Sequence, residues 1–171
     1  MNRSVLFSIF LLTILVLSAC QPSAPAAQPP DNASVADAFS PQSTFCEFQT
    51  EWTVEATTKD WIDVTSFWVA VDEATAQDNF KHLSVEIKLD SGPVAEAMKY
   101  PEGPETYSVT CPDAANSFSG SRMKWSLFLP PLSKGAHTIV WKYTIEADIN
   151  DGFFDYPKGT EQVLTATLNV K

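Results

Sequence analysis

The chain has 171 residues, a length suited to one domain plus a tail. It is acidic, with 21 Asp and Glu against 11 Lys and Arg, which gives a formal net charge of −10 at pH 7. Phosphate backbones repel such a surface, so the composition excludes nucleic acid as a partner. Acidity of this size also keeps a protein soluble.

The first twenty residues have the order of a secretory signal. Arg3 gives a short positive start, residues 5–16 are almost wholly apolar, and Leu17-Ser18-Ala19-Cys20 ends the run. The run is short for a membrane span, which needs about 20 apolar residues. Small residues before a cysteine also favour a cleavage site. The alternatives are an uncut membrane anchor and a secreted form without lipid.

The ending Leu17-Ser18-Ala19-Cys20 resembles the lipobox of bacterial lipoproteins. The resemblance implies that residues 1–19 are removed as a signal peptide and that the thiol of Cys20 is acylated. The acyl chains of that family hold a protein to the membrane permanently. Gln21 is not the aspartate that the family uses for inner-membrane retention. The resemblance therefore implies a lipid anchor on the exported side of the bacterial envelope, at an outer membrane or the outer cell face.

Residues 20–44 are rich in Pro, Ala and Ser and contain few bulky apolar side chains. Such a segment cannot bury enough surface to fold, so we expect a tether. Pro-rich linkers extend by about 3.1 Å per residue at most, which would hold the following domain well away from the membrane.

Cys46 and Cys111 remain once Cys20 is assigned to lipid. An export signal implies an oxidising compartment, where an even pair of cysteines favours a disulfide. Closing a loop of that span contributes about 4 kcal/mol in the chain-entropy model, before native strain is subtracted. Two buried free thiols are the alternative.

Residues 45–171 alternate between apolar and polar side chains, the pattern of strands with one buried face. Residues 61–71 are apolar on both sides, which predicts a central strand, whereas residues 72–79 interrupt the pattern and residues 94–100 are ambiguous. No segment keeps a helical period. Seven to nine short strands predict a β-sandwich. The expected buried faces are Cys46, Phe48, Trp52 and Val54; Leu83, Val85, Ile87 and Leu89; Tyr107, Val109 and Cys111; Met123, Trp125, Leu127 and Leu129; Ile139, Trp141, Tyr143, Ile145 and Ala147; and Leu164, Ala166, Leu168 and Val170.

Residues 129–145 read LPPLSKGAHTIVWKYTI, in which Gly135 is suited to a positive φ. This portion resembles the E–F turn and F strand of bacterial immunoglobulin-like domains. The resemblance implies an all-β, immunoglobulin-like antiparallel sandwich for residues 45–171, and it implies no function. His137 stands where many such domains have a corner tyrosine, so we expect it to hydrogen-bond back into the turn.

Enzyme signatures are mostly missing from the sequence. It contains no G-x-S-x-G, H-E-x-x-H or C-x-x-C motif and no glycine-rich phosphate loop. Residues 121–124 match S-x-x-K, but they run into a predicted strand, where positions three apart face opposite ways. We therefore expect a protein that is not an enzyme and that needs no cofactor.

The segment from residue 146 to residue 161 is long for a connection between two strands. Asp148, Asn150, Asp151 and Asp155 offer hard oxygen ligands of the kind that Ca²⁺ prefers. The alternative is a turn, because Asn-Asp-Gly is favoured where φ becomes positive. The spacing does not match an EF-hand loop.

Phe153, Phe154 and Tyr156 lie in the same loop. Exposed aromatic side chains of this kind stack on sugar rings or anchor protein partners. The alternative is that they fold inward and close the end of the sandwich.

Three functions follow from these features. The leading hypothesis is a lipid-anchored envelope protein, held to the membrane by its acyl chains, that binds a protein or glycan partner through residues 148–161 without catalysis. The second is a calcium-stabilised structural module of the cell surface. The third, a hydrolase of envelope glycans, is disfavoured by the missing motifs.

Overall fold

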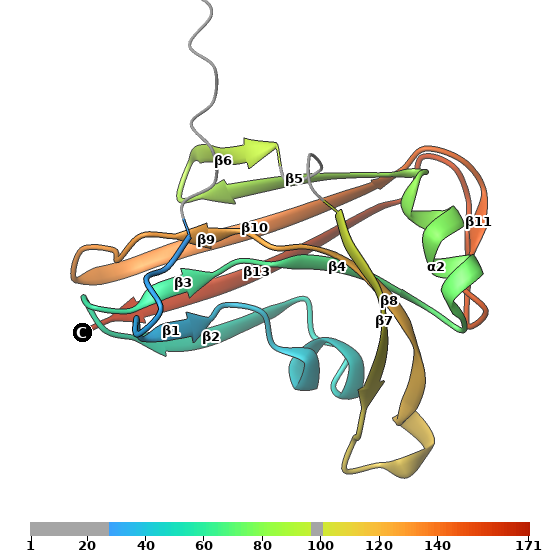
Figure 1. Cartoon of the computed structure of the whole chain (residues 1–171), viewed down its shortest axis with the longest axis horizontal. Coiled ribbons are helices and arrows are strands. Elements are labelled where there is room, and N and C mark those ends of the chain that lie inside the picture. The colour runs from blue at the N-terminus through green and yellow to red at the C-terminus, as the bar shows by residue number, and fades with distance from the viewer. Residues whose placement is uncertain (1–27, 97–100) are drawn as a thin grey trace, which may run out of the picture.

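The computed structural model describes residues 28–96 and 101–171, so the predicted signal peptide, Cys20 and the first part of the predicted tether lie outside the described residues. The described chain is mostly β (Figure 1). Its strands are β1 (Val35–Asp37), β2 (Glu51–Ala56), β3 (Trp61–Asp63), β4 (Ser66–Ala70), β5 (Leu83–Leu89), β6 (Gly92–Glu96), β7 (Pro101–Val109), β8 (Phe118–Trp125), β9 (Phe128–Leu129), β10 (Gly135–Ile145), β11 (Ile149–Asn150), β12 (Asp155–Tyr156) and β13 (Glu161–Val170). The helical elements are α2 (Glu73–Phe80), the π-helical turn η1 (Gln42–Cys46) and the 3-10 turn η3 (Ala114–Asn116).

The all-β prediction is confirmed, although the strands are more numerous than expected. Thirteen strands are described, of which eight have five or more residues and five have two or three. The expected seven to nine strands therefore match only the longer ones. Pieces of two or three residues are too short to show an alternating pattern.

A five-stranded sheet in the order β2-β13-β10-β5-β6 forms one layer, with all pairs antiparallel except β13 and β2. Alternate residues of its long strands point into the core, as their sequences predict. The predicted inward residues that are buried here are Leu83, Val85 and Ile87 on β5, Ile139, Trp141, Tyr143 and Ile145 on β10, and Leu164, Ala166, Leu168 and Val170 on β13.

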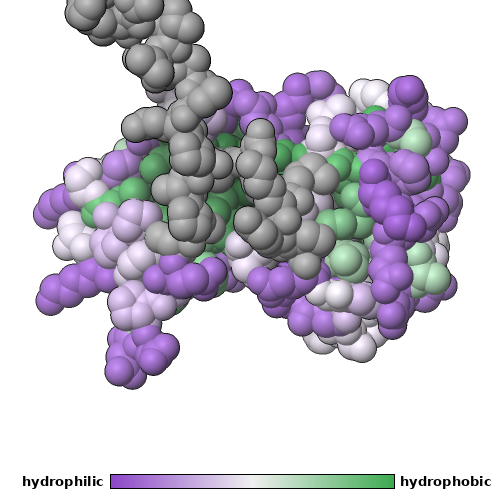
Figure 2. All heavy atoms as spheres, turned by 45° about the horizontal axis from the view of Figure 1, so that its top comes forward, coloured by the Kyte–Doolittle hydropathy of each residue, from purple (hydrophilic) through white to green (hydrophobic). Residues whose placement is uncertain are grey.

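The strands of the sheets β4-β8-β7 and β1-β3-β9 supply the facing side of the core. Two of the polar contacts that join the layers lie near the middle of β10. The indole N–H of Trp141 donates to the carbonyl of Val64 at 3.1 Å, and the hydroxyls of Ser66 and Tyr143 lie 2.8 Å apart. Hydrophilic residues surround the hydrophobic ones on the face shown in Figure 2, as the acidic composition leads one to expect.

Residues 72–79, which interrupt the strand pattern as expected, form most of helix α2. Asp72 caps the helix by accepting the backbone N–H of Thr75 at 2.8 Å. Phe80 at its end stacks on Trp125, with ring centroids 3.7 Å apart. The helix has only eight residues, too few to show a sustained helical period in the sequence.

Two expectations at the start of the domain are wrong. The strand predicted to begin near Cys46 begins at Glu51, and Phe48 lies at φ 53° with its side chain exposed rather than on the face of Trp52. Residues 35–39, assigned to the tether, contribute β1, paired with β3, and two buried residues. The packed chain therefore starts before residue 45. The free energy gained by burying a few apolar side chains orders this segment, although its neighbours have the composition of a tether.

A search of the described residues finds no helix with the length and apolar character that a membrane crossing requires.

His137 makes the expected hydrogen bond back into its turn, with Nε2 2.9 Å from the carbonyl oxygen of Ser133. Its Nδ1 lies 3.1 Å from a carboxylate oxygen of Asp90, and Gly135 has the predicted positive φ. Both neighbours of the ring are acceptors, and only the protonated imidazolium donates to both. The Ser133 carbonyl, followed by the Asp90 carboxylate, therefore raises the pKa of His137. The Thr138 N–H, followed by His137, lowers the pKa of Asp90.

The His137–Asp90 pair predicts a pH dependence of stability. A histidine whose pKa is raised in the folded protein stabilises the fold below the pKa of the unfolded chain, about 6.5, and this stabilisation is lost as pH rises through the folded pKa. An aspartate whose pKa is lowered in the folded protein stabilises the fold above its unfolded pKa of about 3.9. The pair is therefore fully effective between about pH 4 and 6.5. The loss of unfolding free energy on His137→Gln, measured by urea denaturation, should be larger at pH 5.5 than at pH 8.0. An equal loss at both would contradict this assignment.

Candidate binding pocket

An aromatic cavity of about 510 Å³ lies beside the loop that joins β11 to β12. Its walls come from the segment around η1, from η3 and the start of β8, and from residues 151–156, while β4, β10 and β13 supply its floor. Ten of the eighteen residues that line it are aromatic, and only Asp151 among them is charged. A concave, largely apolar site of this volume is typical of ligand binding.

The lining rings contact one another. The ring centroid of Tyr156 lies 5.1 Å from that of Trp68 and 6.5 Å from that of Phe154. On the other side Phe118 lies 5.6 Å from Phe153. Edge-to-face pairs at these distances are favourable, so the rings stabilise one another without being fully covered.

Three phenylalanines at the pocket are exposed to solvent. Phe48 is 67% exposed, Phe154 62% and Phe153 41%. They are half of the six large hydrophobic side chains that are exposed in the described part of the chain. Concentrated exposure of this kind marks interaction sites, whereas scattered apolar residues are ordinary. The loop aromatics therefore do not simply close the end of the sandwich: Phe154 points largely outward, and Tyr156 packs inward on Trp68.

Asp151 holds the loop in shape from within. One carboxylate oxygen accepts the backbone N–H groups of Phe153 and Phe154, each at 2.7 Å, and the other lies 3.1 Å from the hydroxyl of Tyr156. The residue is only 5% exposed. Burial, followed by the nearby Asp151 charge, raises the pKa of Tyr156, which therefore stays protonated and donates. Gly152 follows at φ 88°, where a Cβ would overlap Val71.

The other polar residues of the loop make hydrogen bonds within it. Asp148 accepts the backbone N–H of Lys158 at 2.7 Å, and Asn150 accepts that of Gly152 and donates to Asp155, both at 2.7 Å. Among the described residues no group of three or more His, Cys, Asp or Glu side chains is placed to hold a metal ion. Gly152 has the positive φ, 88°, that the Asn-Asp-Gly sequence favours.

The seven predicted loop residues do not form one site. Asp151, Phe153, Phe154 and Tyr156 line the aromatic cavity. Asp148 and Asn150 line a different, polar cavity beside α2. Asp155 is exposed on β12 and lines neither of these two cavities.

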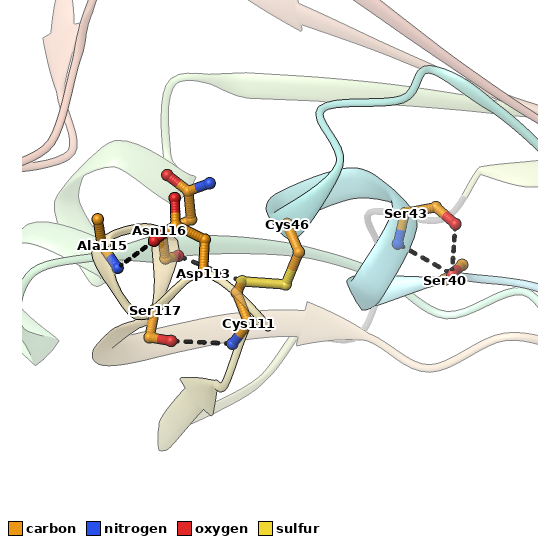
Figure 3. Close-up of a disulfide and its surroundings, with 8 residues drawn as sticks. All are labelled: Ser40, Ser43, Cys46, Cys111, Asp113, Ala115, Asn116 and Ser117. Carbon is orange, nitrogen blue, oxygen red and sulfur yellow. Dashed lines mark hydrogen bonds between the residues drawn. A yellow bond between two sulfur atoms is a disulfide. The ribbon is translucent and has the colours of Figure 1, made fainter.

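The predicted disulfide between Cys46 and Cys111 is present and joins two walls of the cavity (Figure 3). Cys46 ends η1, whereas Cys111 follows β7 and donates its backbone N–H to the hydroxyl of Ser117 at 2.8 Å. Phe45, which precedes Cys46 in the chain, lines the cavity, and so does Ser117, which accepts the backbone N–H of Cys111. The covalent bond thus fixes one wall relative to the other.

Sequence reasoning missed most of the floor and the far wall, including Phe39, Phe45, Phe67, Trp68 and Phe118. These residues are scattered along the chain, and each is also an ordinary core or loop aromatic in its own segment. The one available signal was the abundance of aromatic residues, 12% of the chain, which says nothing of where they meet.

Comparison with protein-family models, with curated proteins and with solved structures finds no match for this chain.

Removal of the disulfide should destabilise the fold. It closes a loop with a sequence separation of 65, worth about 4 kcal/mol in the chain-entropy model. The double variant Cys46→Ser, Cys111→Ser should lose up to that amount of unfolding free energy in urea denaturation. As a control, reducing agent should lower the stability of the native chain and leave the double variant unchanged. Equal stability of the two proteins without reductant would contradict the prediction.

Proposed function

We propose that the protein is a lipid-anchored component of the bacterial cell envelope whose immunoglobulin-like β-sandwich domain binds a ligand in the aromatic cavity without catalysis. The observation that carries the proposal is the cavity itself. It combines about 510 Å³ of space with ten aromatic residues and a rim of exposed rings. Apolar pockets with a few fixed polar groups are the usual form of a binding site.

The chemistry of the lining supports binding rather than reaction. Neither His82 nor His137 lines the cavity, and its one carboxylate, Asp151, already accepts three hydrogen bonds within the loop. The described lining thus offers no nucleophile with an adjacent base and no pair of carboxylates.

The proposed place of action rests on the sequence of residues 1–20, and the disulfide is compatible with it, since disulfides persist in exported proteins. In this proposal, residues of the tether between Cys20 and β1 let the domain reach a ligand away from the membrane surface. The contact surface is the loop from residue 148 to residue 161 together with the walls that it meets.

Replacement of Cys20 tests the anchor. Cys20→Ser removes the acylated thiol, so the protein should move from the membrane fraction to the soluble fraction of the envelope while its far-UV circular dichroism and Tm stay the same. Ser23→Ala is the matched control: it changes a residue of the predicted tether outside the lipobox and should leave the protein in the membrane fraction. Retention in the membrane of a Cys20→Ser protein from which residues 1–19 have been removed would reject the lipid anchor.

Replacement of the rim rings tests the cavity. We expect the full-length protein in detergent to bind 1-naphthol, a neutral aromatic probe, in calorimetry corrected for empty micelles. The double variant Phe153→Ala, Phe154→Ala should bind it about tenfold more weakly, because it removes apolar surface that the bound probe would bury, and tenfold corresponds to about 1.4 kcal/mol. Val35→Ala, a change of another exposed apolar residue outside the cavity, should have no effect. Binding that survives the double variant unchanged would place the site elsewhere.

A further inference from the structure

We propose that the aromatic cavity binds an organic cation, specifically a methylated ammonium group attached to a larger body. This inference rests on the proposed binding function and names the chemical class of the ligand. Three properties of the lining carry it: the sign of its charge, the nature of its surface, and the way its carboxylate is already used.

The charge of the cavity is negative and has no described counterion. Asp151 is the one charged residue in the lining, it is buried, and it forms no ion pair within the described part of the chain. A buried charge without an opposite charge is costly, so a cation in the cavity would gain from it. The formal net charge of −10 adds a long-range attraction for cations.

The surface of the cavity suits a cation that sheds its water. Aromatic faces attract cations within about 6 Å of the ring centroid, most strongly where water is excluded. The protein already uses this interaction next to the cavity, where the guanidinium of Arg122 lies 4.4 Å from the ring centroid of Tyr107 and 5.3 Å from that of Phe67. That positive charge is compensated by Glu105, whose carboxylate lies 2.7 Å from Nε of Arg122.

The hydrogen bonds of Asp151 distinguish a methylated ammonium from a primary one. The carboxylate already accepts two backbone N–H groups and the hydroxyl of Tyr156. A primary ammonium has three N–H donors, and each donor left without an acceptor in an apolar cavity is costly. A trimethylammonium group has no N–H and needs only the charge and the rings.

The cavity also has room and polar atoms for the rest of the ligand. Its volume of about 510 Å³ is in the range of sites that hold drug-sized molecules. Asn116 and Gln162 among the lining residues carry side-chain amides, which would hydrogen-bond a hydroxyl or carbonyl oxygen on the body of the ligand.

The test compares molecules that differ only in charge or methylation. Choline, its uncharged isostere 3,3-dimethyl-1-butanol and the primary amine ethanolamine are titrated separately into the full-length protein by calorimetry, with displacement of 1-naphthol as a second readout. We expect choline to bind at least about tenfold more tightly than either of the others, which corresponds to about 1.4 kcal/mol. Equal affinity for choline and its uncharged isostere would overturn the inference.

Two variants assign the effect to the named groups. Asp151→Asn removes the charge while its amide keeps an acceptor for the two N–H groups, and Phe154→Leu removes an exposed ring while keeping an apolar side chain. Each should weaken choline severalfold and change the affinity for 3,3-dimethyl-1-butanol little. Should Asp151→Asn fail to fold, Phe154→Leu decides alone. Unchanged choline affinity in a folded Asp151→Asn protein and in Phe154→Leu would also reject the inference.

The outcomes separate this inference from the proposed function. If 1-naphthol binds and choline shows no advantage, the cavity is a binding site but its ligand is not a cation. If neither 1-naphthol nor choline binds, both this inference and the proposed binding function are rejected. Phosphocholine distinguishes the source: weaker binding than choline indicates a free cation, and tighter binding indicates a lipid headgroup, both of which carry the methylated ammonium.

Discussion

The two hydrogen bonds between Trp141 and Val64 and between Tyr143 and Ser66 connect the layers of this fold at the middle of its longest strand. All four residues are buried, and burial raises the pKa of Tyr143 to about 12, so its hydroxyl stays protonated. A buried polar group without a partner is costly, which means that the layers cannot slide past each other without losing both bonds. Tyr143 also lies in the floor of the aromatic cavity, so the same constraint gives the cavity a rigid base.

The walls of the cavity depend on local covalent and hydrogen bonds in addition to sheet pairing. Cys46 and Cys111 join the segment before β2 to the end of β7, and Asp151 shapes the opposite loop through two backbone N–H groups and a tyrosine hydroxyl. The disulfide and the Asp151 hydrogen bonds each hold only a few residues outside the long strands. A rigid β base with loops fixed in this manner is the usual way to hold binding side chains in place.

The sequence predicted those parts of the fold in which the local pattern and the final environment agree. The inward faces of β5, β10 and β13 follow directly from alternation, and the disulfide follows from the predicted export signal and an even pair of cysteines. The sequence did not predict α2 or the burial of Phe39, because an eight-residue helix and a short buried segment leave no periodic trace. Among the walls of the cavity, the sequence predicted only the one formed by the loop of residues 151–156. The partners of Phe153 and Tyr156, namely Phe118 and Trp68, lie far away in sequence and meet them only through the topology.

Exposed rings on a protein that we propose to be anchored to a membrane raise the question of whether they insert into lipid. Their electrostatic setting opposes it. Insertion at anionic membrane surfaces relies on Lys and Arg beside the apolar residues, each worth about 1 kcal/mol, whereas the lining here contains Asp151 and no basic residue in a chain of net charge −10. Leaving a phenylalanine in water rather than burying it forgoes about 1.5–3 kcal/mol. The disulfide and the core offset that loss without help from lipid. The rim of the cavity is therefore better suited to a ligand that arrives through the aqueous phase, and the sign of its charge favours a cation.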